Sequence, residues 1–165
     1  LAHQFIEADY SLWIDGNIEL LKPIDELIDL YLKDHDIAMF KHPQRDCLYE
    51  EGGICHSRGY DDRETIKQQL EKYEAEGFGK HRGLCEGMFI LRRHTPKVEE
   101  FNNYWWSEHC RHSVRDQISM SYALDKAGLE PNAIDIQFRE HNGHLRRGGI
   151  IEIYNHLTKR DEVSI

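Results

Sequence analysis

Apolar side chains gather in short runs, and these runs alternate with longer segments in which apolar residues have helical spacing. Such runs lie near residues 10–14, 37–40 and 88–91, and a last strand is predicted over 134–138. The uninterrupted apolarity of 37–40 is typical of a parallel strand that is covered on both faces. The pattern therefore predicts a buried sheet.

Four helices are predicted between and after these strands. Pro23 suits the first turn of one helix, and the next begins at Asp61. Thr95 is the expected N-cap of the third helix, because a proline follows it. Ser113 and Asp116 have the spacing of a capping box ahead of the fourth. In that interpretation the Asp116 carboxylate serves only to cap the helix.

The alternation of strands and helices predicts an α/β layered fold, in which helices flank a largely parallel central sheet. Segment 45–60 is compatible with a short helix over 47–51 followed by a glycine-rich turn. We expect one α/β domain over residues 1–140. Residues 141–165 form a polar C-terminal tail, which is expected to pack on or near the functional site.

Charge and composition argue against several classes of function. The chain has 165 residues, and its 30 acidic and 21 basic residues give a net charge of -9. This balance opposes binding to nucleic acid or to anionic membranes, whose phosphates would be repelled. No signal-peptide layout and no apolar run long enough to span a bilayer are present. The four cysteines lack Cys-x-x-Cys spacing, so no zinc knuckle or redox motif is indicated.

The most informative motif follows the first predicted strand. Asp15 and Asn17 flank Gly16 at the carboxyl end of this strand, the edge at which α/β sheets bind ligands. Their side-chain oxygens suit a hard cation such as Mg²⁺ or Mn²⁺. The alternative is a simple Asp-Gly turn without a ligand.

Around this motif, the chain resembles a glycosyltransferase-like family of long-uncharacterised domains, found in bacteria and in plant proteins of mucilage and pollen-wall development. The residues that carry the resemblance lie in blocks 10–18, 42–51, 69–77, 83–86, 92–94, 105–106 and 113–117. The family is similar to the GT-A class of nucleotide-sugar transferases. The resemblance therefore implies a GT-A-like, Rossmann-like fold and a nucleotide-sugar donor.

In that class, an Asp-x-Asp signature holds a divalent cation, Mn²⁺ or Mg²⁺, against the diphosphate of the donor. Asp15 and Asn17 stand at the two positions here, and Asn17 offers an oxygen without a charge. His141 or His144 is expected as a later metal ligand. The resemblance also implies a nucleotide-binding portion ahead of the motif. Few residues precede it here, so we expect part of that portion to be missing from this chain.

The remaining site residues are assigned by chemistry within this resemblance. An inverting transfer needs a carboxylate that deprotonates the acceptor hydroxyl, and the candidates are Asp116 and Glu86. Donor-binding roles are expected for six residues: Trp13, Gly16, Asn17, His42, Arg115 and Gln117. Arg115 is suited to an anionic leaving group, and Gln117 is suited to sugar hydroxyls.

Together these observations predict a metal-dependent glycosyltransferase of the hexosyl- or uronosyltransferase type, which moves a sugar to a glycan-like acceptor. An alternative is an Asp-dependent phosphohydrolase, although Trp13 stands where that class places its first Asp. A non-catalytic glycan-binding module with the same fold is the other alternative. The expected location is the cytoplasm for a bacterial protein, or the Golgi lumen for a segment of a longer eukaryotic one.

Overall fold

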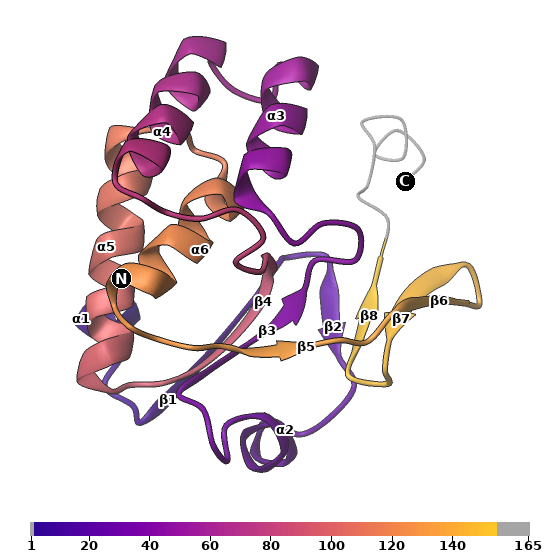
Figure 1. The fold of residues 1–165 in the computed structure, drawn as a ribbon. Coiled ribbons are helices and arrows are strands. Elements are labelled where there is room, and N and C mark those ends of the chain that lie inside the picture. Colours follow the sequence, from indigo (N-terminus) through magenta and orange to yellow (C-terminus); the bar gives the residue numbers. More distant parts are fainter. Residues whose placement is uncertain (1, 155–165) are drawn as a thin grey trace.

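The computed structural model describes residues 2–154 (Figure 1). Its helices are α1 (Ala2–Phe5), α2 (Ile24–Tyr31), α3 (Leu48–Arg58), α4 (Arg63–Ala75), α5 (Pro96–Arg111) and α6 (Asp116–Lys126). Its strands are β1 (Tyr10–Ile14), β2 (Ile18–Leu20), β3 (Ile37–Lys41), β4 (Cys85–Arg93), β5 (Asn132–Ile134), β6 (Phe138–His141), β7 (His144–Arg147) and β8 (Ile151–Ile153). The chain is thus mixed α/β, as its sequence predicts.

The strands form two sheets with four strands each, in the orders β1-β4-β3-β5 and β2-β8-β7-β6. In the larger sheet, β4 runs antiparallel to both β1 and β3, and only β3 and β5 are parallel. The prediction of a largely parallel sheet is therefore wrong. The apolar run of β3 indicates that both faces of the strand are covered. Such burial occurs in parallel and antiparallel strands alike, so the run does not predict strand direction.

Helices and the smaller sheet cover the two faces of the larger sheet (Figure 1). On one face, Ile37 and Ile90 pack against Phe101 of α5 and Met120 of α6. On the other face, Phe40 and Phe89 belong to a cluster that includes α2 and the smaller sheet. A third cluster joins α3 and α4 to α6. The sheet is therefore the middle layer, and its upper edge in Figure 1 lies close to the start of α6.

Several helix boundaries agree with their sequence signals. Helix α2 begins directly after Pro23, and Thr95 caps α5 by accepting a hydrogen bond from the backbone N–H of Val98. Helix α4 begins after Asp62, slightly later than predicted, because Asp62 accepts the capping hydrogen bond from Thr65. These local signals are reliable where a side chain satisfies a backbone donor that the helix leaves free.

Helix α3 is longer than the predicted 47–51, because its two glycines lie inside the helix and do not form a turn. A Cβ atom at Gly52 would lie 2.7 Å from Cδ1 of Leu70 in α4. Glycine at this position therefore allows the two helices to approach closely. This packing outweighs the low helix propensity of glycine.

The C-terminal part of the chain is more ordered than its polar sequence suggests. Strands β6 and β7 form a hairpin whose turn residues, Asn142 and Gly143, both have positive φ. Strand β8 then pairs with β2, so the predicted polar tail contributes to a sheet as far as Ile153. The rest of that tail lies outside the described residues. No helix within the described part has the length and apolar character needed to cross a membrane.

Candidate functional site

The Asp15–Ile18 motif forms a hydrogen-bonded turn at the end of β1. The N–H of Ile18 donates to the carbonyl of Asp15 at 3.0 Å, and the N–H of Asp15 donates to Met88 at 3.1 Å. The Asp15 side chain is exposed. Gly16 has no positive φ, and a Cβ there would meet nothing within 4 Å, so the turn itself does not require glycine. The motif therefore combines a turn with an exposed carboxylate at the end of a strand.

Asn17 connects this turn to the end of the described chain. Its Nδ2 donates to the carbonyl of Tyr154 at 2.8 Å, and the N–H of Tyr154 donates back to the Asn17 carbonyl at 2.9 Å. An aspartate at this position has no proton for the first bond. The amide therefore fixes β8 beside the turn, and its Oδ1 has no hydrogen-bond donor among residues 2–154.

A pocket of about 550 Å³ opens beside Asp15. Its floor is formed by β1 and β4, and α5 forms the facing wall. The residues that line it are Phe5, Ile6, Trp13, Asp15, Gly87, Ile90, Arg92, Asn102, Trp105, Trp106, His109 and Asp116. The register of β3 against β4 shifts between Met39 and Lys41, and this irregularity allows both Gly87 and Ile90 to face the pocket. The pocket thus joins three predicted site residues: Trp13, Asp15 and Asp116.

Asp116 is the half-buried carboxylate of this pocket. Burial raises the pKa of Asp116 above its ordinary value, and the nearby charge of Asp15 adds to the rise. The N–H of Gln117 donates to Oδ1 at 3.0 Å and opposes it, as does the charge of Arg115. A carboxylate whose pKa is raised toward neutrality is a stronger base than an ordinary aspartate.

The capping-box prediction for this segment is wrong. Helix α6 begins at Asp116, its N-cap is Arg115, and the Arg115 side chain makes no capping hydrogen bond. The Ser113 hydroxyl donates instead to Asp61 at 2.8 Å, which ties the preceding loop to the start of the α4 segment. The Trp105 indole donates to the backbone carbonyl of Asp116 at 3.2 Å. The loop and α5 therefore hold Asp116 in place, and among residues 2–154 its carboxylate accepts only the N–H of Gln117 in the first turn of the helix.

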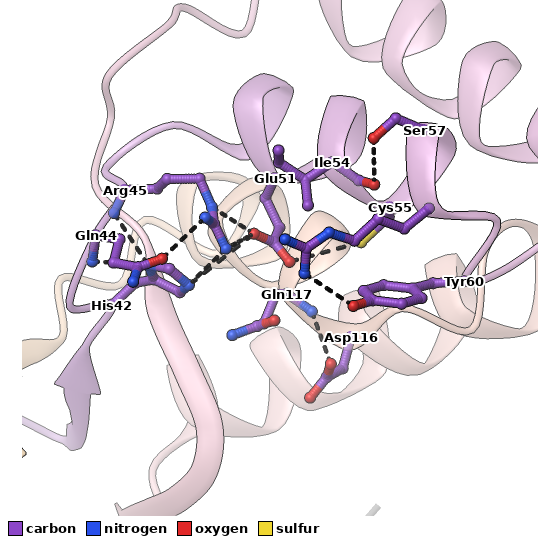
Figure 2. A network of polar contacts seen from close by, with 11 residues as sticks. His42, Gln44, Arg45, Glu51, Ile54, Cys55, Ser57, Tyr60, Asp116 and Gln117 are labelled. Atoms are coloured by element: carbon purple, nitrogen blue, oxygen red, sulfur yellow. Dashed lines mark hydrogen bonds and ion pairs between the residues drawn. The ribbon is translucent and has the colours of Figure 1, made fainter.

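His42 lies in a separate polar network at the end of β3. Its Nδ1 accepts hydrogen bonds from the N–H groups of Gln44 and Arg45, and the Arg45 side chain pairs with Glu51 at 2.6 Å. Burial, reinforced by the Arg45 charge, lowers the pKa of His42. Figure 2 shows this network with Gln117 drawn below it. His42 does not line the pocket, and the neutral ring organises the loop that leads into α3.

Arg115 and Gln117 flank Asp116 without lining the pocket themselves. The Arg115 guanidinium lies over the ring of Tyr60 at 5.4 Å, and its Nε is buried without a partner among the residues described. The side chain therefore sits between α6 and the end of α3. Its role in donor binding stays a prediction.

Glu86 pairs with a buried arginine outside the pocket. Arg147 is fully buried, and its guanidinium contacts Glu86 and donates to the backbone carbonyls of Ile136 and Lys41. Burial raises the pKa of Glu86, whereas Arg147 counteracts the rise. This pair joins β4 to β7 and thus the larger sheet to the smaller one. A catalytic role for Glu86 stays a prediction. Because Glu86 lies outside the pocket, Asp116 is the better candidate for the base.

Replacing Arg147 by methionine is expected to lower the free energy of unfolding by about 3–5 kcal/mol, because Glu86 then stays buried without its partner. Urea denaturation measures this loss. Arg82→Met is the matched control, since Arg82 pairs with Asp125 at the surface and this pair contributes little. Equal losses for both variants would contradict a structural role for the Arg147 pair.

The structure separates the two candidate histidines. His141 is exposed at the hairpin turn, whereas the His144 ring packs on Tyr154 with centroids 4.5 Å apart. His144 lies on β7, one strand closer to β2 than His141 in the sheet order. Its Nδ1 is buried without a partner among the described residues. His144 is therefore better placed than His141 to reach Asn17, although both stay predictions as metal ligands.

The residues at this edge are compatible with a cation that the donor helps to hold. Within residues 2–154, no group of three or more His, Cys, Asp or Glu side chains is arranged to bind a metal by itself. Mg²⁺ in phosphate-transfer sites is commonly held by one or two carboxylates, substrate phosphates and water. Asp15 and the free Oδ1 of Asn17 fit that mode of binding.

Sequence reasoning missed several residues of the pocket. The sequence Arg92-Arg93-His94 favours a surface charge run over a phosphate contact, but Arg92 points inward from β4 at 7% exposure. Gly87 and Asn102 carried no sequence signal, because their importance depends on contacts between distant segments. Helical spacing predicts Trp105 on the core side of its helix, and it predicts that Trp106 points away, either to stack on a sugar or to pack under a loop. In the structure Trp105 contacts the core and Trp106 is 52% exposed.

Comparison with known proteins adds a family relationship to this geometry. A family model described as TOD1/MUCI70, glycosyltransferase-like domain, matches residues 1–143. A curated relative from Arabidopsis thaliana, "Probable hexosyltransferase MUCI70", is 32% identical over 143 residues, covering 80% of this chain and 25% of the relative. The chain thus spans about a quarter of the length of that relative. No solved structure matches the chain.

Proposed function

Since the chain belongs to the TOD1/MUCI70 glycosyltransferase-like domain family, we propose that it transfers a sugar from a nucleotide-sugar donor to a hydroxyl of a glycan-like acceptor. The observation that carries this proposal is the pocket in which the half-buried carboxylate of Asp116 lies near the strand-end carboxylate of Asp15. We assign the Asp15 carboxylate to binding of the donor and the Asp116 carboxylate to the acceptor hydroxyl.

On the donor side, Asp15 and the Asn17 Oδ1 would hold a divalent cation in a GT-A-like manner. His144 is the further ligand that its position supports best. Such a cation would supply Lewis-acid stabilisation of the negative charge on the leaving nucleoside diphosphate. Asn17 also keeps the turn rigid through Tyr154, so the Asp15 carboxylate is preorganised.

On the acceptor side, Asp116 accepts the proton of the attacking hydroxyl as the new glycosidic bond forms. The sugar–phosphate bond breaks, and its electron pair leaves with the diphosphate. The raised pKa of Asp116 suits this role, because proton transfer is most efficient when the pKa of the base lies near the working pH. This arrangement supports an inverting reaction.

Asp15→Ala is expected to weaken Mn²⁺-dependent nucleotide binding by more than about tenfold, a loss that even disturbed outer-shell partners of a metal cause. Calorimetric titration with uridine and guanosine diphosphate, with and without Mn²⁺, measures this effect. Asp9→Ala removes an exposed carboxylate at the other end of β1 and is the matched control. If Asp15→Ala binds nucleotide and metal as the parent does, the assignment of Asp15 is wrong.

The same titration separates the alternatives. A glycan-binding module without turnover would bind oligosaccharides but show no Mn²⁺-enhanced nucleotide binding and no donor hydrolysis. A phosphohydrolase would release inorganic phosphate from phosphomonoesters. Either result with the parent protein would overturn the transferase proposal.

A further inference from the structure

The pocket has a buried cation at the end opposite its carboxylates. Arg92 is 7% exposed and lines the pocket from β4. Its Nη1 donates to Oδ1 of Asn102 at 2.9 Å, and its Nε has no partner in the described part of the chain. No carboxylate of residues 2–154 lies within ion-pair distance of this guanidinium. Burial lowers the pKa of Arg92.

A buried arginine without a counter-ion is unusual, because removing a charge from water is costly unless an opposite charge compensates. Arg147 of the same chain follows the ordinary pattern, since it is buried against Glu86. At Arg92 the protein provides only the neutral amide of Asn102 and the nearby rings of His3 and His94. Within residues 2–154 the charge of Arg92 therefore has no counter-ion, and an anion that enters the pocket is able to supply one.

Strand geometry separates the two ends of the pocket. Arg92 pairs with Ser11 in the register of β4 against β1, and Ile90 pairs with Trp13. Asp15 follows two residues beyond Trp13 on the same strand face. Four residues of extended chain span about 13 Å. An anionic group at Arg92 is thus held well away from the repulsive carboxylates of Asp15 and Asp116.

Aromatic side chains lie between and beside these ends. All three tryptophans of the chain line the pocket. Trp13 and Trp106 are 55% and 52% exposed, so each presents an open ring face. Flat aromatic faces beside a few polar groups are typical of sites that bind amphipathic ligands such as sugars.

We propose that this pocket is the acceptor subsite and that Arg92 selects an acceptor sugar bearing a carboxylate or phosphate. The anionic group is held by Arg92, the ring lies against the tryptophans, and a neutral hydroxyl is directed toward Asp116. The role as acceptor rests on the proposed function, whereas the anion preference rests on Arg92 alone.

Tryptophan fluorescence reports on this pocket directly, because every tryptophan of the chain lines it. The parent protein is titrated with glucuronate, glucose 6-phosphate, glucose and inorganic phosphate. At least one anionic sugar is expected to bind about tenfold more tightly than glucose, the preference that one charge-assisted hydrogen bond gives. Inorganic phosphate alone is expected to bind more weakly than the preferred sugar, since it lacks the ring. The two anionic sugars identify whether the carboxylate or the phosphate is preferred.

Arg92→Gln is expected to abolish the preference for anionic sugars, and Arg92→Lys is expected to retain most of it. The lysine variant provides the test if Arg92→Gln does not fold. Arg93→Gln is the control, because Arg93 donates to the carbonyl of Leu32 and does not line the pocket. Equal binding of glucose and both anionic sugars by the parent would overturn the proposal. An unchanged preference in Arg92→Gln, or a lost preference in Arg92→Lys together with normal folding, would do the same.

Calorimetry with uridine diphosphate and Mn²⁺ is run on the same proteins. Parent protein that shows the anion preference but no nucleotide binding would overturn the transferase proposal and leave the Arg92 site standing. Nucleotide binding without an anion preference would overturn the Arg92 site alone.

Discussion

Asp116→Asn is expected to reduce donor hydrolysis and sugar transfer by about 100- to 10,000-fold, the range that a general base contributes. Asparagine has nearly the same shape and still accepts the hydrogen bond from the N–H of Gln117, so the fold is retained. It cannot take a proton from the acceptor. Hydrolysis of the donor sugar nucleotide, monitored by release of nucleoside diphosphate, measures the loss.

The same substitution is expected to raise the melting temperature at pH 7. Burial raises the pKa of Asp116 in the folded state above that in the unfolded state, so the charged carboxylate destabilises the fold at neutral pH. Stability from this group is fully present only below the unfolded pKa, and it is lost as the pH rises through the folded pKa. The gain in Asp116→Asn therefore shrinks as the pH falls, and each kcal/mol recovered corresponds to about 2–4 °C.

Asp125→Asn is the matched control, because Asp125 is an exposed carboxylate of the same helix and pairs only with Arg82 at the surface. Its activity and melting temperature should stay close to those of the parent. The acid side of the parent pH–rate profile should fall at a pH above the ordinary pKa of aspartate. Unchanged hydrolysis in Asp116→Asn, with lower stability at pH 7, would show that Asp116 is structural.

Gly87→Ala is expected to reduce activity about as much as Asp116→Asn does, although Gly87 itself does not take part in the reaction. A Cβ at Gly87 would overlap Oδ2 of Asp116 and lie 3.3 Å from its Cγ. Because Asp116 begins α6 and Trp105 holds its backbone, the carboxylate must rotate away from the pocket. The strain is expected to lower the free energy of unfolding by about 1–3 kcal/mol, as overpacking does.

Gly53→Ala is the control for the added methyl group. Gly53 lies inside α3, where a Cβ meets nothing within 4 Å, so alanine there should stabilise the protein by about 0.5–1 kcal/mol. The effect of Gly87→Ala is measured by donor hydrolysis and urea denaturation. A stable Gly87→Ala protein with parental hydrolysis would contradict the role assigned to the Asp116 carboxylate.

Sequence reasoning succeeded where the signal is local. The strand 10–14, the helix after Pro23 and the Thr95 cap follow from neighbouring residues, and the structure has all three. The prediction that Asp15 ends a strand is also confirmed. In each case, the interactions that decide the conformation lie within a few residues of one another.

Sequence reasoning failed where contacts between distant segments determine the structure. The direction of β4 relative to β1 and β3 leaves no trace in the apolar pattern, because buried strands of either direction have the same composition. Gly52 resembled a turn residue, but its contact with Leu70 of another helix explains it better. Ser113 and Asp116 have capping spacing, yet Asp61 takes the Ser113 hydroxyl.

The candidate site follows the same division. Asp15 and Asp116 could be chosen from sequence, because carboxylates at strand and helix ends are recognisable. Arg92 could not be distinguished from Arg93, since two adjacent arginines on a strand point to opposite faces and only the fold determines which one is buried. Glu86 was an equally good candidate base until its pairing with Arg147 became apparent.

The bond from Asn17 to Tyr154 has a consequence for how the protein folds. The two residues are 137 positions apart, and both strands that they connect are short. Closing so long a loop is entropically costly, so this contact forms after the local helices and hairpins. The turn that carries Asp15 is therefore completed late in folding. A chain in which β8 has not yet docked lacks this ordered turn at the edge of the pocket, so the geometry of the pocket is complete only when the fold is complete.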